Sequence, residues 1–194
     1  MDVKELSKYW DNSFIKYDDD KLNVYKLNRN TVDFLSKVGL PNGEKAKEKL
    51  AYNFLEIDNM QKKIINDEEY IKIEQYRNSD GFIAVKVNTE EIFYISLADE
   101  RYVSKDIVKY CNKNIENFIL FCTILGMNYD NIENDELEGY QCARETVEEF
   151  KKIDIKSVCQ QSYWINILMD YAIDYFYDMD EDFQKVLKEK RYKT

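Results

Sequence analysis

Two short runs of alternating apolar and polar residues, separated by a polar turn, stand out at residues 81–97, GFIAVKVNTEEIFYISL. This alternation has the two-residue period of a β-strand, so the segment predicts a β-hairpin over residues 82–87 and 93–97. Residues 88–91 are polar and suit a turn. One hairpin face is expected to meet a core and carries Ile83, Val85, Val87, Phe93, Ile95 and Leu97. We expect helices to cover the other apolar face, which carries Phe82, Ala84, Ile92 and Tyr94.

Weaker strand patterns lie on both sides of the hairpin. Residues 51–57 are rich in Tyr and Phe, and residues 70–76 alternate and end near a turn cluster at residues 78–81. Four consecutive strands with short connections predict a largely antiparallel meander. We expect residues 101–103 to add a short fifth strand and residues 22–27 to form a short extended segment.

Helical patterns begin at the N-terminus. Asp2 can cap a helix over residues 3–10, and Asn30 can cap a helix over residues 31–38. The sequence Gly39-Leu40-Pro41 follows the second helix. Glycine favours a helix end and proline prevents the helix from resuming, so this is the sharpest boundary in the chain.

After residue 114 the apolar period lengthens to that of a helix. The pattern predicts helices over residues 115–125, 135–153 and 158–176. We expect Gly126 to break the first of them and Asp154 to cap the segment that follows the second. The charged end, residues 178–194, is expected to form a tail that is acidic and then basic.

Length and charge limit the classes of function. At 194 residues the chain predicts one domain over residues 1–194. A net charge of -10 disfavours nucleic acid as a partner, because phosphate binding depends on concentrated Lys and Arg. A basic protein partner fits this charge, although solubility alone also explains it.

The cysteines and the apolar runs bear on location. Four cysteines lie far apart with no Cys-x-x-Cys pair, as expected for reduced thiols in a cytoplasmic protein. The N-terminal residues 1–10 are charged and lack the apolar centre of a signal peptide. The longest apolar run, residues 119–125, is far shorter than the roughly 20 residues of a membrane span, so we expect no membrane partner.

The residue type used most often for proton transfer near neutral pH is missing. The chain has no histidine, so the usual general base at neutral pH and the commonest metal ligand are absent. Neither of the common glycine-rich phosphate-binding motifs occurs. Carboxylate pairs could still catalyse, or bind a hard cation at residues 18–20 or 67–69, but neither run matches an EF-hand loop. We therefore expect no enzyme activity, no cofactor and no metal.

Tyrosines beside acids are the most suggestive feature. Tyrosine gives contact area at low entropic cost, and acids steer a basic partner toward the contact. Ordinary loops and edge-strand tyrosines explain each case equally well. Three segments have this character, and their candidate contact residues are Tyr17, Asp18, Asp19 and Asp20; Asp67, Glu68, Glu69 and Tyr70; and Asp99, Glu100 and Tyr102.

The order of these motifs resembles the SUKH superfamily of bacterial immunity proteins over about residues 3–175. Residues 34–41, FLSKVGLP, resemble the helix ending in Gly-Leu-Pro that opens the family, and residues 81–97 resemble its central strands. Residues 111–121, CNKNIENFILF, are similar to the start of its next helix. Lys152-Ile153-Asp154 with Tyr163-Trp164 is similar to the closing pattern of its fourth subgroup.

This resemblance implies an α+β fold in which a largely antiparallel, curved sheet of about five or six strands is backed by helices. It implies a protein that binds and neutralises a cognate polymorphic toxin, frequently a nuclease or deaminase, by occlusion. The alternatives are an intracellular regulatory scaffold that uses the same fold to bind an endogenous protein, and an enzyme with paired carboxylates in one pocket.

Overall fold

The computed structural model of the chain describes residues 3–42, 44–50, 53–74, 81–97, 105–133, 139–159 and 162–173. The chain divides into two units, Met1–Gly126 and Met127–Thr194, which we describe separately. The predicted cap at Asp2, the strand at 101–103 and the tail at 178–194 lie outside the described residues. The single domain expected from the length stays a prediction.

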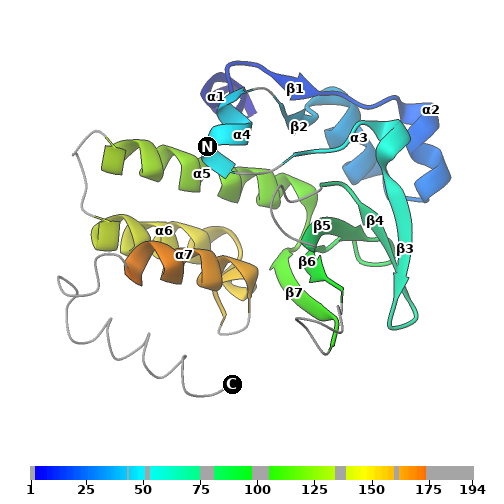
Figure 1. The fold of residues 1–194 in the computed structure, drawn as a ribbon. Helices are drawn as coiled ribbons and strands as arrows, with labels where there is room; N and C mark the ends of the chain where they lie inside the picture. The colour runs from blue at the N-terminus through cyan, green and yellow to red at the C-terminus, as the bar shows by residue number, and fades with distance from the viewer. Residues whose placement is uncertain are drawn as a thin grey trace. The chain divides into compact units, whose positions relative to one another are not determined.

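The first unit contains a five-stranded antiparallel sheet (Figure 1). Each strand pairs with the next along the chain, so the predicted antiparallel meander and the α+β class are confirmed. The strands are β3 (Gln61–Ile65), β4 (Glu68–Lys72), β5 (Gly81–Lys86), β6 (Ile92–Ser96) and β7 (Ile107–Asn112).

The central hairpin forms where the alternation predicted it, but the residues that share each face differ from those predicted. Ile83 lies opposite Tyr94 and Val85 opposite Ile92, because five residues separate Lys86 from Ile92 and shift the register by one position. Our assignment of Ile83 to the same face as Ile95 was therefore wrong. The second face is instead shared by Phe82, Ala84 and Ile95 with Ile65 and Tyr70, all of them buried.

The strand predicted at residues 51–57 is short and interrupted. Phe54 forms an isolated bridge with Glu74, and the Leu55 amide donates to the Ile73 carbonyl. The chain then leaves the sheet in a 3₁₀ turn, η2 (Ile57–Asn59), and returns as β3. The prediction missed β3 because its sequence, QKKII, places Gln61 and Lys63 on the same face as the buried Ile65, where an alternating core strand would carry apolar side chains. It also missed β7.

Four short helices precede the sheet in the first unit: α1 (Val3–Tyr9), α2 (Asp19–Leu22), α3 (Arg29–Lys37) and α4 (Glu44–Leu50), with a 3₁₀ turn, η1 (Asn23–Tyr25), after α2. Residues 22–27, expected to be extended, are thus largely helical. The α3 cap is Asn28, whose Oδ1 accepts from the Thr31 amide at 3.0 Å. The predicted cap, Asn30, lies inside the helix because Asn28 offers the same capping chemistry two residues earlier.

Gly39 ends the α3 region as predicted. Its φ is +92°, and its amide donates to the Phe34 carbonyl at 2.9 Å. A side chain at this position would collide with the carbonyl of Ile15. This close approach lets β1 (Phe14–Ile15) pair with β2 (Leu40–Pro41) in a separate two-stranded sheet.

Helix α5 (Ile115–Glu133) starts where predicted but passes through Gly126. A glycine fits there because a Cβ would meet the hydroxyl of Tyr9, so α1 lies close to α5 at this point. The Trp10 indole also donates to Thr123 Oγ1 at 2.9 Å. Packing against α1 offsets the usual cost of a helical glycine, which sequence alone could not show.

The second unit contains α6 (Gly139–Ile153), a 3₁₀ turn η3 (Ile155–Val158) and α7 (Tyr163–Ile173). The ring centroids of Phe150 and Trp164 lie 5.5 Å apart and join α6 to α7. Asp154 starts η3, but with its backbone carbonyl, which accepts from the Ser157 amide, and not with a side-chain cap. The last predicted helix begins at Tyr163, later than expected.

Among the residues that the structure describes, no helix combines the length and the apolar character needed to cross a membrane. Cys111, Cys122 and Cys142 are buried as free thiols, and Cys159 is an exposed free thiol.

Candidate functional site

Tyr17, the first candidate contact residue, lies inside the protein. Its side chain is 4% exposed, and its hydroxyl donates to the Leu55 carbonyl at 2.8 Å. Burial, followed by the nearby charge of Glu56, raises the pKa of Tyr17 well above its usual value. The ring therefore has a structural role, in holding the segment that leads toward β3.

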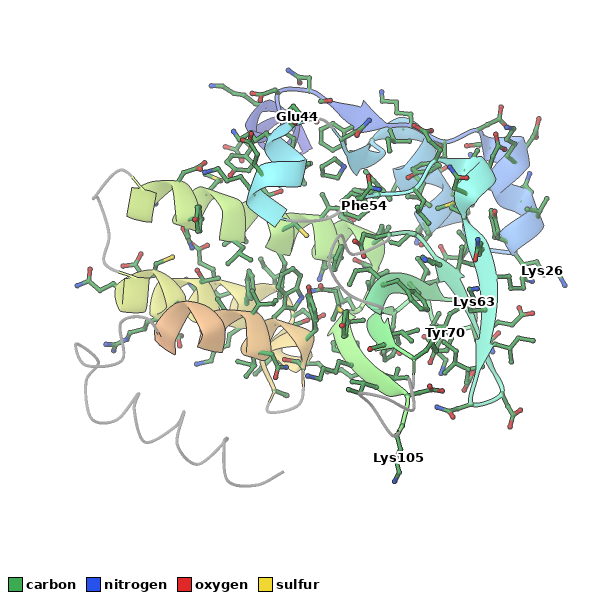
Figure 2. All side chains as sticks on the ribbon, in the orientation of Figure 1. Lys26, Glu44, Phe54, Lys63, Tyr70 and Lys105 are labelled. Carbon is green, nitrogen blue, oxygen red and sulfur yellow. The ribbon has the colours of Figure 1, made fainter. Side chains whose placement is uncertain are left out.

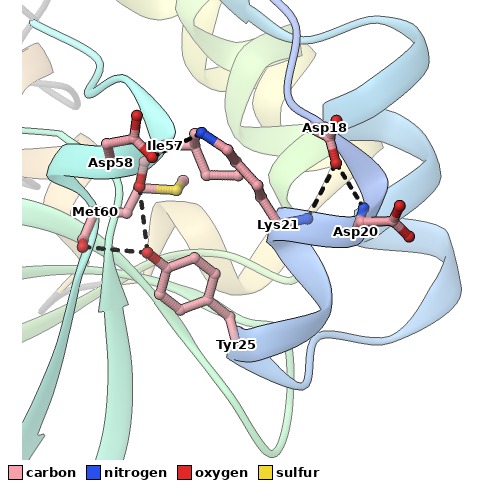
Figure 3. A network of polar contacts seen from close by, with 7 residues as sticks. All are labelled: Asp18, Asp20, Lys21, Tyr25, Ile57, Asp58 and Met60. Carbon is pink, nitrogen blue, oxygen red and sulfur yellow. Dashed lines mark hydrogen bonds and ion pairs between the residues drawn. The ribbon is translucent and has the colours of Figure 1, made fainter.

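The three acids after Tyr17 differ in their surroundings; Figure 3 draws Asp18 and Asp20. Asp18 caps α2, because its Oδ1 accepts from the amides of Asp20 and Lys21 at 2.8 and 3.1 Å. Asp19 forms an ion pair of 3.3 Å with Arg29. Among these three carboxylates, Asp20 is exposed and forms neither a capping hydrogen bond nor an ion pair of this kind.

The same helical segment docks on residues 56–60, which we call the 56–60 loop (Figure 3). Lys21 Nζ lies 2.9 Å from Asp58 Oδ1, and this hydrogen bond raises the pKa of Lys21. The Tyr25 hydroxyl lies 3.3 Å from the Ile57 carbonyl and 3.2 Å from the Met60 carbonyl. Together with the Tyr17 bond, these contacts fix the loop immediately before β3.

The second candidate segment forms the turn between β3 and β4. Asn66 and Asp67 both have positive φ, as a tight two-residue hairpin turn requires. Glu68 pairs with Lys86 at 3.0 Å and Glu69 with Lys62 at 3.3 Å, while Asp67 is exposed at the tip. The predicted contact acids therefore belong to a well-formed hairpin.

Tyr70 is also buried, at 5% exposed. It lies opposite Lys63 in the pairing of β3 with β4, and Figure 2 labels both residues. Its ring and the Phe93 ring pack in a T-shaped arrangement at a centroid distance of 5.8 Å. Like Tyr17, it packs a core. A partner that bound at these two segments would contact the acids. It would not contact Tyr17 and Tyr70, the side chains that made the segments conspicuous in the sequence.

The third candidate segment, with Asp99, Glu100 and Tyr102, lies outside the described residues. The other two segments lie toward opposite ends of β3. This strand has five residues, so they are separated by roughly 17 Å at the usual rise per residue. A separation of this size is small enough for one ordinary protein interface, which buries about 800 Å² per partner.

Two exposed aliphatic side chains lie in this region. Ile64 of β3 is 71% exposed and Val24 of η1 is 67% exposed, the two largest exposures among the big apolar side chains described in the first unit. We use the name β3 surface for five exposed residues of this region, Asp20, Val24, Asp58, Ile64 and Asp67; Gln61 and Lys62 of β3 are exposed beside them. The sequence feature that could have identified Ile64 is the Asn66-Asp67 turn, because a two-residue turn predicts that residues 61–65 form one strand of a hairpin.

Glu74 is the most unusual acid of the first unit. It is fully buried, its Oε2 accepts from the Ile83 amide at 3.1 Å, and its Oε1 accepts from the Asn53 amide at 3.4 Å. Burial raises its pKa to about 8, and the two backbone hydrogen bonds oppose that shift. Where β4 separates from β5, the Glu74 carboxyl accepts the hydrogen bond from Ile83 that a backbone carbonyl of the neighbouring strand would otherwise accept. It therefore holds the sheet together at this point.

The described part of the chain contains no group of three or more Cys, Asp or Glu side chains placed to hold a metal ion. Comparison with protein-family models, curated proteins and solved structures gives no match to this chain.

Proposed function

We propose that the chain is an immunity protein of the SUKH type, which binds a cognate toxin domain in the cytoplasm and neutralises it by occlusion. The sequence resemblance suggests this class of function. The structural observation in its favour is the exposed Ile64, which lies on an outer strand between acidic groups at Asp58 and Asp67.

The β3 surface has the composition of a binding site for a protein. Binding energy in protein interfaces is concentrated in a few apolar or aromatic side chains near the centre, and polar groups surround them. Here Ile64 supplies the apolar centre, and the charged surroundings are Asp20, Asp67, Lys62 and the ion pair of Asp58 with Lys21.

The net charge of the chain favours a partner of positive charge. A toxin that acts on nucleic acid carries positive charge at its active surface, and a protein with a net charge of -10 would be drawn toward it. Covering that surface blocks the substrate and requires no chemical step from the immunity protein. The lack of histidine is compatible with such a role.

Co-expression with the toxin domain encoded beside this gene tests the proposal. We expect the protein to restore growth and to copurify with the toxin domain as a stoichiometric complex. A toxin domain from an unrelated system serves as the control and should remain lethal. If the neighbouring toxin domain neither copurifies nor loses toxicity, the proposed function is wrong.

A further inference from the structure

The free edge of β3 offers more than its side chains. In the part of the chain that the structure describes, β3 is the outer strand of its sheet and pairs with β4 alone. An outer strand presents unpaired backbone N–H and C=O groups, which can pair with a strand of another protein.

The hydrogen bonds show which residues present these groups. The Val87 amide donates to the Glu69 carbonyl and the Ile73 amide donates to the Ile83 carbonyl, so odd-numbered β4 residues face β5. Bonding direction alternates along an antiparallel strand, so even-numbered β4 residues face β3. Tyr70 lies opposite Lys63, so Lys63 faces inward. Lys62 and Ile64 therefore direct their N–H and C=O groups outward.

We propose that the toxin domain contributes an extended strand that pairs with β3 through the backbone of Lys62 and Ile64. This inference rests on the proposed function and specifies how the partner binds. The Ile64 side chain is exposed at the same place, so one residue offers a backbone pair and an apolar contact.

The chemistry of β3 defines the strand that fits. Residues 61–65, QKKII, carry two lysines and no acid, although the whole chain has a net charge of -10. A fitting strand therefore carries an acid beside the lysines and an apolar side chain beside Ile64, because cross-strand pairs of opposite charge are favoured. A basic group flanking that strand would meet Asp67 at one end of β3, whereas Asp58 at the other end is already paired with Lys21.

A second copy of this chain is a poorer occupant. The antiparallel pairing of two β3 strands with the longest overlap places Lys62 opposite Ile64 and the two Lys63 side chains opposite each other. Like charges in that position are unfavourable, and two chains of charge -10 also repel. The lysines thus discourage self-pairing while leaving an acidic strand acceptable.

Amide hydrogen exchange, followed residue by residue by NMR, tests the pairing. In the free protein, the amides of Lys62 and Ile64 should exchange quickly and those of Lys63 and Ile65 slowly. When the copurified toxin domain is bound, we expect exchange at Lys62 and Ile64 to slow by roughly 100-fold or more. If the toxin domain binds and those two amides stay unprotected, strand pairing is wrong while the proposed function stands.

A proline pair provides a second test. Lys62→Pro removes an outward N–H, and an edge strand tolerates proline at such a position. Lys62→Ala removes the same side chain and keeps the N–H. We expect the proline variant to bind the toxin domain about tenfold more weakly than the alanine variant, with similar urea midpoints. If the two variants bind the toxin domain with equal affinity, strand pairing is wrong. If the wild-type protein does not bind the toxin domain, both proposals are wrong.

Discussion

The Tyr17 hydroxyl donates a hydrogen bond of 2.8 Å to the carbonyl of Leu55, 38 residues away in the sequence. This bond joins the segment before α2 to the segment that enters β3. The Lys21–Asp58 ion pair and the Tyr25 hydroxyl act on the adjacent 56–60 loop. The acidic, tyrosine-bearing segment thus positions the outer strand that we propose as the binding edge.

Tyr17→Phe should reduce stability without changing binding. The substitution leaves a buried carbonyl with one acceptor bond fewer, which costs about 1 kcal/mol of unfolding free energy in urea denaturation. Affinity for the toxin domain should stay within about twofold, because Tyr17 is 4% exposed. Unchanged stability combined with a large loss of affinity would show that the ring contacts the partner directly.

Substitutions of Asp18 and Asp20 should separate an effect on stability from an effect on the rate of association with the toxin domain. Asp18→Ala removes the α2 cap and should cost about 1 kcal/mol, whereas Asp18→Asn keeps a capping oxygen and should cost much less. Asp20→Asn should leave the urea midpoint unchanged and lower the rate of association with the toxin domain at low salt. An association rate that depends on neither Asp20 nor salt would remove steering from the proposed mechanism.

Glu74 should make stability depend on pH. Its pKa is about 8 in the folded protein and 4.5 ordinarily, so between these values the folded protein binds more protons than the unfolded chain. Its contribution to the free energy of unfolding is therefore complete below about pH 4.5 and decreases as pH rises toward 8.

The matched control for this pH effect is Glu74→Gln, which cannot ionise. The difference between the unfolding free energies of wild type and variant isolates the contribution of Glu74 from that of the other acids. We expect this difference to favour wild type most at low pH and to shrink toward pH 8. A difference that is constant over this range would mean that Glu74 is ionised throughout.

Gly39→Ala should be strongly destabilising. Its φ of +92° disfavours any side chain, and a Cβ would collide with the Ile15 carbonyl. We expect a loss of at least about 2 kcal/mol in urea denaturation. An effect below about 0.5 kcal/mol would contradict the close approach between the α3 end and β1.

The sequence predicted features governed by local chemistry. The alternation at residues 81–97 located the hairpin, and Gly39 located a helix end, because both depend on neighbouring residues. Features that depend on distant contacts were missed. Gly126 continues a helix because Tyr9 packs against it, and Tyr17 and Tyr70 are buried by segments far along the chain.

The candidate site shows the same division. The acids of residues 18–20 and 67–69 are at the surface or partly exposed, in keeping with their composition. Ile64 could not be identified from the sequence as the apolar centre, because that requires knowing which strand is outermost. A sequence alone does not give the order of strands in a sheet. Only the hairpin turn before β4 hinted at β3.

Calorimetric titration of the purified toxin domain into wild type, Ile64→Asp and Ile155→Asp tests the binding claim most directly. Ile64 and Ile155 are 71% and 69% exposed, so the two variants impose a matched change at different places. We predict saturable binding by wild type and Ile155→Asp, and affinity at least about tenfold lower for Ile64→Asp, whose urea midpoint falls slightly because the new carboxylate lies opposite Glu69. No binding by wild type, or equal affinity for all three proteins, would contradict the claim that the molecule acts by holding a partner at β3.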